Sequence, residues 1–426
     1  MSLDRAPRPL ALALALAAPT AFADVLVVDQ AAGPGSDFVE IQGAIDAAAE
    51  GDLILVRAGG YASFSVAAKG VSIVAEKDQL VFVGGTMRVQ DTAPGQAVHL
   101  RSLRTGQAAG EGLWVEDCAG TVWVESCTLV GEDLSSLFDS THGARILDSE
   151  AVVLVRTDAR GGDASTSGGG GGDGLRLQDS RVHVWGGSYV GGEGAFHDDL
   201  GGWGGDGIDQ RGGFLFAASA LLAGGMGGGA DDDPSDPFGG GTGVSCGLPG
   251  QGGAGLSLDD FLSASAPVAA VYGLQLDPGP GGWTTSVKGC SDGADGLPIQ
   301  NLGGALTTTA TPERVLRASS PVRELQELKF TLTGPANDSA FVFASSTPSA
   351  LFLGAQLGSL FLGAPTPLVG AGVLPAGGEL ELAWSAPLLA PGAEGVQLYA
   401  QSVWIDAGGQ LVLGPVSGLT LLDQLQ

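Results

Sequence analysis

The feature that most constrains this chain is a short unit that recurs along much of its length. Each unit opens with alternating apolar and polar residues, bends at an Asp, and then alternates again. The clearest copy is GLWVEDCAGTVWVESCTLVG from Gly112. Related copies start at Thr86, Gly143 and Gly174, and weaker ones at Gly207 and Gly255. Repetition at such a period is typical of solenoids, in which each unit is one coil stacked on the next.

The alternation predicts which side chains fill the coils. Successive side chains of a β-strand point to opposite faces, so the apolar residues of each unit point inward together. The expected inward residues are Leu113, Val115, Val122, Val124, Ala144, Ile146, Leu175, Leu177, Val182 and Val184. Because short strands stack in this way, the chain buries a long, narrow core. The sequence therefore predicts an all-β parallel β-helix over residues 24–305.

The segment before the repeat predicts a cap for the first coil. Ile41, Ala44, Ile45 and Ala48 have the spacing of an amphipathic helix over Phe38–Glu50. The run AIDAAAEGDLILVRAGGY resembles the opening of the pectin-lyase-like family, whose members are right-handed parallel β-helices closed by such a helix. A cap covers the unpaired backbone groups at the end of a coil. The resemblance also implies a ladder of stacked polar side chains along one turn, here Asp91, Asp117, Asp148 and Asp179.

The units differ mainly in the glycine-rich segments that connect them. Glycine accounts for 73 of 426 residues, yet 44% of the chain is hydrophobic, which excludes a simple disordered polypeptide. The segments lengthen along the chain, from SSLFDSTH and DASTSGGGGGD to EGAFHDDLGGWGGD and MGGGADDDPSDPFGGGTGVSCGLPGQGGA. All of them enter at one turn of the coil, so we expect a glycine-rich shelf on one side. Loops of this length are either functional or mobile.

The pattern changes at Thr311. Alternating runs such as LKFTLTG, AFVFASS and ELELAWSA follow, separated by turns of Pro, Gly, Asn and Ala. Strands at this spacing predict a small antiparallel β-sandwich over residues 311–426. VQLYAQSVWID followed by GQLVLGPVSG predicts a hairpin with Gly408 and Gly409 at its turn. The segment resembles the small C-terminal β-sandwich modules of large exported bacterial proteins.

Residues 1–23 have the pattern of a secretory signal peptide. Two arginines precede an apolar run from Leu10 to Ala18, and Ala-Phe-Ala fits cleavage before Asp24. The run is too short to span a membrane, and no later segment is long enough. The formal net charge of −28 argues against nucleic acid and anionic membranes, which attract basic surfaces. These features predict a secreted or cell-surface protein.

Four cysteines in an exported chain permit two disulfides. Cys246 and Cys290 flank glycine-rich stretches and are the preferred pair. Cys118 and Cys127 are separated by a predicted strand, which leaves their pairing open.

One acidic group suggests calcium. Carboxylate oxygens are ligands that Ca²⁺ prefers, and four carboxylates gather within six residues at Asp231, Asp232, Asp233 and Asp236. The alternative is an acidic, solvated loop. No other cofactor is expected.

Candidate ligand-binding residues are expected on the outward face of the coils. The first strand of each unit presents Arg88, Trp114, Arg145 and Arg176, and the next strand presents His99, Trp123 and His183. Cations beside aromatic rings hold an acidic or neutral polysaccharide by ion pairing and ring stacking. The alternative is a solvated surface whose arginines pair with acids such as Asp148 and Asp179.

Fold alone does not give function, because pectin-lyase-like helices include lyases, galacturonases, epimerases, tailspikes, adhesins and inert scaffolds. A hydrolase of this fold needs paired carboxylates on the outer face. Asp198-Asp199 and Asp259-Asp260 are acidic pairs, but the family's Gly-His-Gly and Arg-x-Lys motifs are not found. The sequence favours a non-catalytic exported scaffold or adhesive protein that binds polysaccharide along its outer face. The alternative is a polysaccharide lyase or another carbohydrate-active enzyme with a divergent site.

Overall fold

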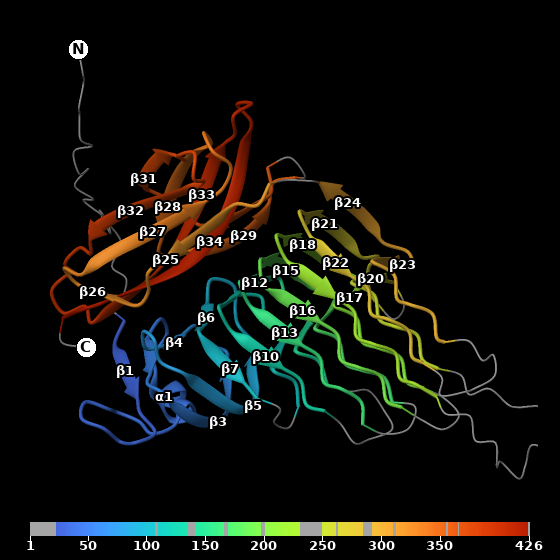
Figure 1. Ribbon diagram of the computed structural model, residues 1–426. Helices are drawn as coiled ribbons and strands as arrows, with labels where there is room; N and C mark the ends of the chain where they lie inside the picture. The colour runs from blue at the N-terminus through green and yellow to red at the C-terminus, as the bar shows by residue number, and fades with distance from the viewer. Residues whose placement is uncertain are drawn as a thin grey trace, which may run out of the picture.

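The computed structural model describes residues 23–106, 110–133, 141–165, 169–196, 201–230, 249–260, 263–283, 292–309, 312–354, 357–364 and 366–424. The predicted fold class is confirmed. A parallel β-helix with one short helix is followed by antiparallel sheets that lie along its side (Figure 1). Nearly all of the predicted signal peptide, the expected calcium residues Asp231–Asp236, and both Cys246 and Cys290 lie outside the described residues.

Each complete coil of the β-helix contains three short parallel strands. The first strands are β8 (Leu113–Glu116), β11 (Ala144–Leu147), β14 (Leu175–Gln178), β17 (Ile208–Arg211), β20 (Leu256–Asp259) and β23 (Ile299–Asn301). The second strands are β9 (Thr121–Glu125), β12 (Ala151–Val155), β15 (Arg181–Trp185), β18 (Phe214–Ala218), β21 (Val268–Tyr272) and β24 (Ala305–Thr309). The third strands are β10 (Thr128–Val130), β13 (Asp158–Arg160), β16 (Ser188–Val190), β19 (Leu221–Ala223) and β22 (Gln275–Asp277).

The strands form two parallel sheets. The second strands continue through β6 (Ala97–Arg101), β4 (Ser72–Ala75), β2 (Leu53–Val56) and β1 (Val25–Val28) into a ten-stranded sheet, called here the second-strand sheet. The long strand β5 (Val81–Gln90) pairs with β7 (Leu103–Thr105) and also with β8. It therefore joins the first and third strands, with β3 (Gly59–Ala67), into one fourteen-stranded sheet.

Inward side chains fill the core as predicted. All ten residues that the alternation assigns to the interior are 0% exposed. The Asp ladder at the first bend is also present: Asp91, Asp117, Asp148 and Asp179 all have positive φ, between 44° and 57°. Asp tolerates this left-handed backbone better than most residues. The recurring Asp therefore marks the turn that ends each first strand.

The cap helix is shorter than predicted. Helix α1 spans Ile41–Ala47 rather than Phe38–Glu50, and it ends where Ala48 adopts an extended backbone, with φ −64° and ψ 140°. The expected apolar stripe is nevertheless correct, because Ile41, Ala44 and Ile45 are buried in the core of the β-helix. Packing against the first coil fixes the face of the helix, whereas its ends have no such constraint.

The C-terminal module contains two main sheets, whose strands are antiparallel apart from one parallel pair. The first comprises β25 (Val315–Ala318), β27 (Glu327–Thr333) and β32 (Glu379–Ser385). The second comprises β26 (Val322–Arg323), β34 (Leu411–Leu422), β33 (Gly395–Ile405), β28 (Ser339–Ser345) and β31 (Leu368–Val373), and β29 (Pro348–Phe352) pairs separately with β30 (Ser359–Leu362). The predicted hairpin is β33–β34, whose turn has Gly409 at φ +80°.

The C-terminal module packs on the outward face of the second-strand sheet. An apolar cluster joins Trp123, Val153 and Phe216 of the β-helix to Phe361 and Tyr399 of the module. The ring centroids of Trp123 and Tyr399 are 4.8 Å apart. Covered strands such as β12 and β18 are apolar on both faces, which is typical of a sheet buried on both sides.

The glycine-rich segments leave the β-helix from one side, as predicted, and their described parts run side by side (Figure 1). In each connection an outgoing segment leaves a third strand and a returning segment leads to the next first strand, and backbone hydrogen bonds link the two kinds of segment in alternation. Gly192 N–H donates to the Gly172 carbonyl, Gly205 N–H to the Gly192 carbonyl and Gly225 N–H to the Gly205 carbonyl, at 2.7 to 2.9 Å. Contacts recur at every third residue, the period of a polyproline II helix. A Cβ at Gly225 would lie 1.8 Å from the Gly192 carbonyl oxygen.

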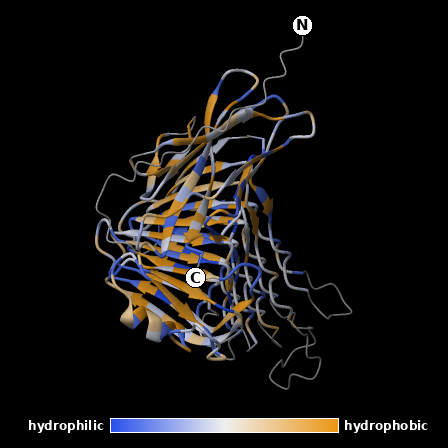
Figure 2. Ribbon diagram, turned by 90° about the vertical axis from the view of Figure 1, so that its left-hand side faces the viewer, coloured by the Kyte–Doolittle hydropathy of each residue, from blue (hydrophilic) through white to orange (hydrophobic). Residues whose placement is uncertain are grey.

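The described parts of the shelf therefore form an array of closely packed glycine segments, called here the glycine array. Only glycine allows the segments to approach this closely. Figure 2 shows the contrast: hydrophobic residues concentrate on the strands, whereas the segments of the array are pale.

Candidate functional site

The predicted arginine-rich row lies on the first strands. Arg88, Trp114, Arg145 and Arg176 occupy equivalent positions of β5, β8, β11 and β14, and Asp209 continues the row on β17. Neighbouring strands of a sheet are about 4.8 Å apart, so side chains at equivalent positions contact one another. The structure therefore brings these four predicted residues together.

Trp114 lies between two guanidinium groups. The Cζ atoms of Arg88 and Arg145 lie 4.6 Å and 4.8 Å from the centroid of its ring, and they come from the strands on either side. The indole N–H donates to Glu116 at 3.1 Å. Both ring faces thus contact arginine, which leaves the edge of the ring for a ligand. The ring holds the arginines in place instead of offering a free stacking surface.

Arg176 is neutralised by acids. Its Nε donates to Asp173 at 2.9 Å and to Asp209 at 3.1 Å. Pairing of the row with acids was the alternative expectation, but the partners are not Asp148 and Asp179. Those two residues lie at the bend that ends the first strand. Asp173 precedes the first strand and Asp209 lies within one, so they are closer to the row.

Arg88 differs from Arg176. Among the described residues its guanidinium makes no hydrogen bond or ion pair, and its recorded contact is the ring of Trp114. It lines an open hollow of about 550 Å³ whose other polar wall residues include Gln42, Ser65, Thr86, Glu111 and Thr141. A guanidinium beside hydroxyl and amide groups is suited to binding the hydroxyl and carboxylate groups of a polysaccharide.

A largely buried ladder that sequence reasoning missed runs beside the row. It consists of Glu111, His142, Asp173 and Asp206, and each side chain accepts the backbone N–H of the equivalent residue one coil on. His142 N–H donates to Glu111, Asp173 N–H to His142 Nδ1 at 2.9 Å, and Asp206 N–H to Asp173 at 2.8 Å. Ala254 N–H closes the ladder on Asp206 at 2.6 Å. The sequence contains a pattern that marks this ladder, because each of the four residues directly precedes the opening glycine of a unit.

Burial shifts the pKa of most groups around this ladder. It raises the pKa of Glu111 to about 7, and it raises that of Asp209 to about 6. Burial, followed by the charges of Arg176 and Arg145, holds the pKa of His142 well below its ordinary value. His142 is therefore neutral, as its role as an acceptor through Nδ1 requires. Its approach to Asp173 at 3.4 Å is consequently not an ion pair.

His99, Trp123 and His183 do not join the arginine row, so that expectation is wrong. They lie on β6, β9 and β15 of the second-strand sheet and are 0% exposed. The bend after the first strand turns these residues to another face, and the C-terminal module covers that face. They pack against Tyr399 and Phe361.

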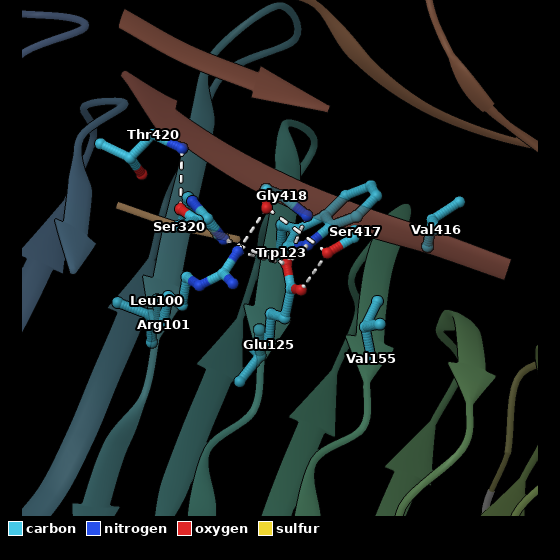
Figure 3. A network of polar contacts seen from close by, with 12 residues as sticks. Leu100, Arg101, Trp123, Glu125, Val155, Ser320, Val416, Ser417, Gly418 and Thr420 are labelled. Carbon is cyan, nitrogen blue, oxygen red and sulfur yellow. Dashed lines mark hydrogen bonds and ion pairs between the residues drawn. The ribbon is translucent and has the colours of Figure 1, made fainter. Parts of the chain in front are cut away.

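A second polar cluster, centred on Glu125 of β9, fastens the module to the β-helix (Figure 3). The buried carboxylate accepts Ser417 O–H at 2.8 Å and Gly418 N–H at 2.5 Å, and it pairs with Arg156 and Arg101. Burial tends to raise the pKa of Glu125, but Arg101, Arg156 and His99 outweigh burial and hold the pKa below its ordinary value. This cluster, called here the interdomain lock, was not found from the sequence.

The lock contains serine, histidine and glutamate, the residue types of a hydrolase triad, but it is not arranged as one. Ser417 donates to the carboxylate, not to a histidine, and Ser417, His99 and Glu125 are all 0% exposed. A substrate has no access to these groups. The lock is therefore structural.

The glycine array exposes aromatic side chains that sequence reasoning also missed. Trp203 is 73% exposed on a returning segment. Phe196 and Trp283 lie on outgoing segments with their ring centroids 5.8 Å apart. The sequence pattern that marks these side chains is GGx, two glycines followed by any residue x, because the third position of each triplet is free to carry a side chain.

The described residues contain neither a cluster suited to a metal ion nor a helix that could span a membrane. No group of three or more His, Cys, Asp or Glu residues there is arranged to hold a metal ion. Within that same part of the chain, no helix is long and apolar enough to cross a membrane.

Comparisons with known proteins give only distant similarities. No family model and no curated protein sequence matches the chain. ORF18 of Geobacillus virus E2 is 9% identical, over 88% of this chain and 82% of that one, with a TM-score of 0.20. The enzymatically active domain of tailspike protein 2 from bacteriophage CBA120 is 8% identical, over 88% and 73%, with a TM-score of 0.14. Superoxide reductase (neelaredoxin) from Ignicoccus hospitalis is 10% identical, over 26% and 81%, with a TM-score of 0.17. None of these similarities is strong enough to assign a function.

Proposed function

We propose that this protein is an exported, non-catalytic scaffold or adhesive of the right-handed, pectin-lyase-like type, which binds polysaccharide along its arginine-rich face. The observation that carries the proposal is Arg88. In a chain with a net charge of −28, its guanidinium is held on Trp114, makes no ion pair with the described residues and lines an open, polar hollow. Such a group is available for a carboxylate or hydroxyl of a glycan.

Two acids beside the arginine-rich row support a non-catalytic role. Asp173 accepts a backbone N–H and pairs with Arg176, and Asp209 is paired with two arginines. Both are almost fully buried. A glycosidase needs two carboxyl groups that reach the scissile bond, whereas these groups are engaged in holding neighbouring coils together.

Binding is tested by affinity electrophoresis of the mature protein in gels that contain polygalacturonate, alginate or a neutral glucan, with and without Ca²⁺. We expect retardation by at least one glycan and a loss of affinity of about tenfold or more in Arg88→Ala, because a charge-assisted hydrogen bond is removed. Arg104→Ala is the matched control, because Arg104 is an exposed arginine away from the row. Equal retardation of both variants would refute the assignment of the face.

Export and calcium are tested separately. Mass spectrometry of protein secreted by its native cell is expected to show an N-terminus at Asp24. Calorimetric titration with Ca²⁺ alone tests Asp231, Asp232, Asp233 and Asp236, by comparing the wild type with a variant that carries Asn at all four positions. A tryptic map without reduction tests the Cys246–Cys290 pair.

One observation favours the alternative, a carbohydrate-active enzyme. Glu111 lines the hollow beside Arg88, and burial raises its pKa to about 7. A carboxyl group with a shifted pKa in a hollow is a candidate for acid–base chemistry. The same glycans are incubated with the protein and assayed for unsaturated products and reducing ends. Product that disappears in Glu111→Gln or Arg145→Ala would overturn the scaffold proposal.

A further inference from the structure

The interface between the β-helix and the C-terminal module is not filled along its whole length. Near Trp123 the two parts are in direct contact. Toward the end of the β-helix the packing leaves a cavity of about 340 Å³. This volume lies at the lower end of the range for small-molecule sites. The cavity is distant in sequence from the arginine-rich row and lies on the other sheet.

One wall of the cavity is a row of three aromatic rings. Trp185, Phe216 and Tyr272 come from β15, β18 and β21. The ring centroids of Trp185 and Phe216 are 5.6 Å apart, with planes inclined by 36°. Those of Phe216 and Tyr272 are 5.2 Å apart and inclined by 40°. Leu357 and Leu413 of the module line the cavity as well. An aromatic wall that faces aliphatic side chains suits a planar, apolar molecule.

Two polar features narrow the class of ligand. Arg314 also lines the cavity, but its guanidinium donates to Asp338 at 2.7 Å and 3.1 Å, so its charge is neutralised. The indole Nε1 of Trp185 is buried, and among the described residues it has no hydrogen-bond partner. A buried donor without a partner is costly, and an acceptor atom on a ligand would remove that cost.

We propose that this interdomain cavity binds a neutral, planar aromatic molecule that carries a hydrogen-bond acceptor, with the indole N–H of Trp185 as the donor. The aromatic wall provides the contact area, and the buried indole N–H, which has no partner among the described residues, selects for the acceptor. The site is assembled from both parts of the chain, so it exists only when the module is docked.

Quinoline and naphthalene are the probes, because they have the same shape and differ by one acceptor nitrogen. Titrations are followed by the indole N–H signals of ¹⁵N-tryptophan-labelled full-length protein. We expect quinoline to bind with a Kd of about 0.1–1 mM, the range that a ligand of this size reaches. Naphthalene should bind about fivefold to tenfold more weakly. The signal absent from Trp185→Phe should move most with quinoline.

Variants make the result decisive. Trp185→Phe keeps a ring but removes the donor, so quinoline should lose its advantage over naphthalene. Trp283→Phe is the matched control, because Trp283 lies on the glycine array, and it should bind as the wild type does. Ala218→Phe fills the floor of the cavity and should abolish binding of both probes. If Trp185→Phe does not fold, Ala218→Phe and the wild-type preference decide. No binding at millimolar concentration, or equal binding of both probes to the wild type, would overturn the proposal.

Discussion

Replacing Glu125 by glutamine tests whether the interdomain lock stabilises this protein. Glutamine has nearly the same shape, but Ser417 O–H donates to one carboxylate oxygen and Gly418 N–H to the other, so the single oxygen of glutamine keeps only one of these acceptors. The charge and one acceptor disappear. Arg101 and Arg156 then remain between the β-helix and the module without their carboxylate, at side-chain exposures of 8% and 21%.

Removing one partner of a buried ion pair typically costs about 3–5 kcal/mol. Arg156 retains some contact with solvent and also donates to the Leu316 carbonyl at 2.7 Å, so we expect a loss near about 3 kcal/mol. An unfolding entropy of about 2 cal/mol/K per residue, over roughly 400 residues, converts this into a fall in Tm of about 4 °C. The fall would be larger if the module unfolds separately, because fewer residues then share the transition.

The assay is thermal unfolding followed by tryptophan fluorescence, since Trp123 lies in the interface. Glu150→Gln is the control, because Glu150 is exposed at a bend and should change Tm by less than about 1 °C. The pH dependence gives a second check. The pKa of Glu125 is lowered in the folded state, so the contribution of its charge is present above the unfolded pKa and is lost as pH falls. The difference between the wild type and Glu125→Gln should therefore be constant above pH of about 5 and shrink at lower pH. A variant as stable as the wild type at pH 7 would refute the stabilising role of the lock.

Three further changes test other parts of the structure. Gly225→Ala should lower the free energy of unfolding in urea by about 2–4 kcal/mol, because its Cβ would lie 1.8 Å from a carbonyl oxygen. Gly60→Ala meets no atom within 4 Å and should be nearly neutral. Equal stability of the two variants would contradict the packing of the glycine array. The pKa of Glu111 is raised to about 7, so its contribution to stability is present at low pH and is lost as pH rises through 7. Glu111→Gln should therefore reduce the loss of stability between pH 5 and pH 8 by about 2–3 kcal/mol. An unchanged dependence of stability on pH would show that Glu111 titrates normally. Cys118 and Cys127 are buried free thiols, and burial raises the pKa of Cys127 to about 12. Both thiols should react with Ellman's reagent only after unfolding. Rapid reaction in the native protein would contradict their buried placement.

The local pattern of the sequence contained much of the structure. Alternation identified the inward residues, because a side chain that faces a narrow coil must be apolar. The recurring Asp marked the first bend, because few residues accept a positive φ. The same register placed Arg88, Trp114, Arg145 and Arg176 in one row.

Other signals were present but were not used. Strands β12, β18 and β21 read AVVLV, FLFAA and VAAVY, and such runs indicate burial on both faces. That pattern already argued that His99, Trp123 and His183 lie under another part of the chain. In the same way, the GGx pattern of the connecting segments has the period of an extended, three-residue helix, and it predicts the close packing that the described parts of these segments show.

The sequence by itself determined the coil, because each strand needs only its neighbours in the next repeat to satisfy its backbone and bury its apolar face. Tertiary structure decided which outward residues remain accessible. Arg88 points outward from the sheet that contains the first strands and Trp123 from the second-strand sheet, and one lines an open hollow whereas the other is sealed under the C-terminal module. The lock that fastens this module joins Glu125 to Ser417 and Gly418, almost 300 residues further along the chain. Local periodicity carries no information about such a contact, because it depends on how two separately patterned parts of the chain dock.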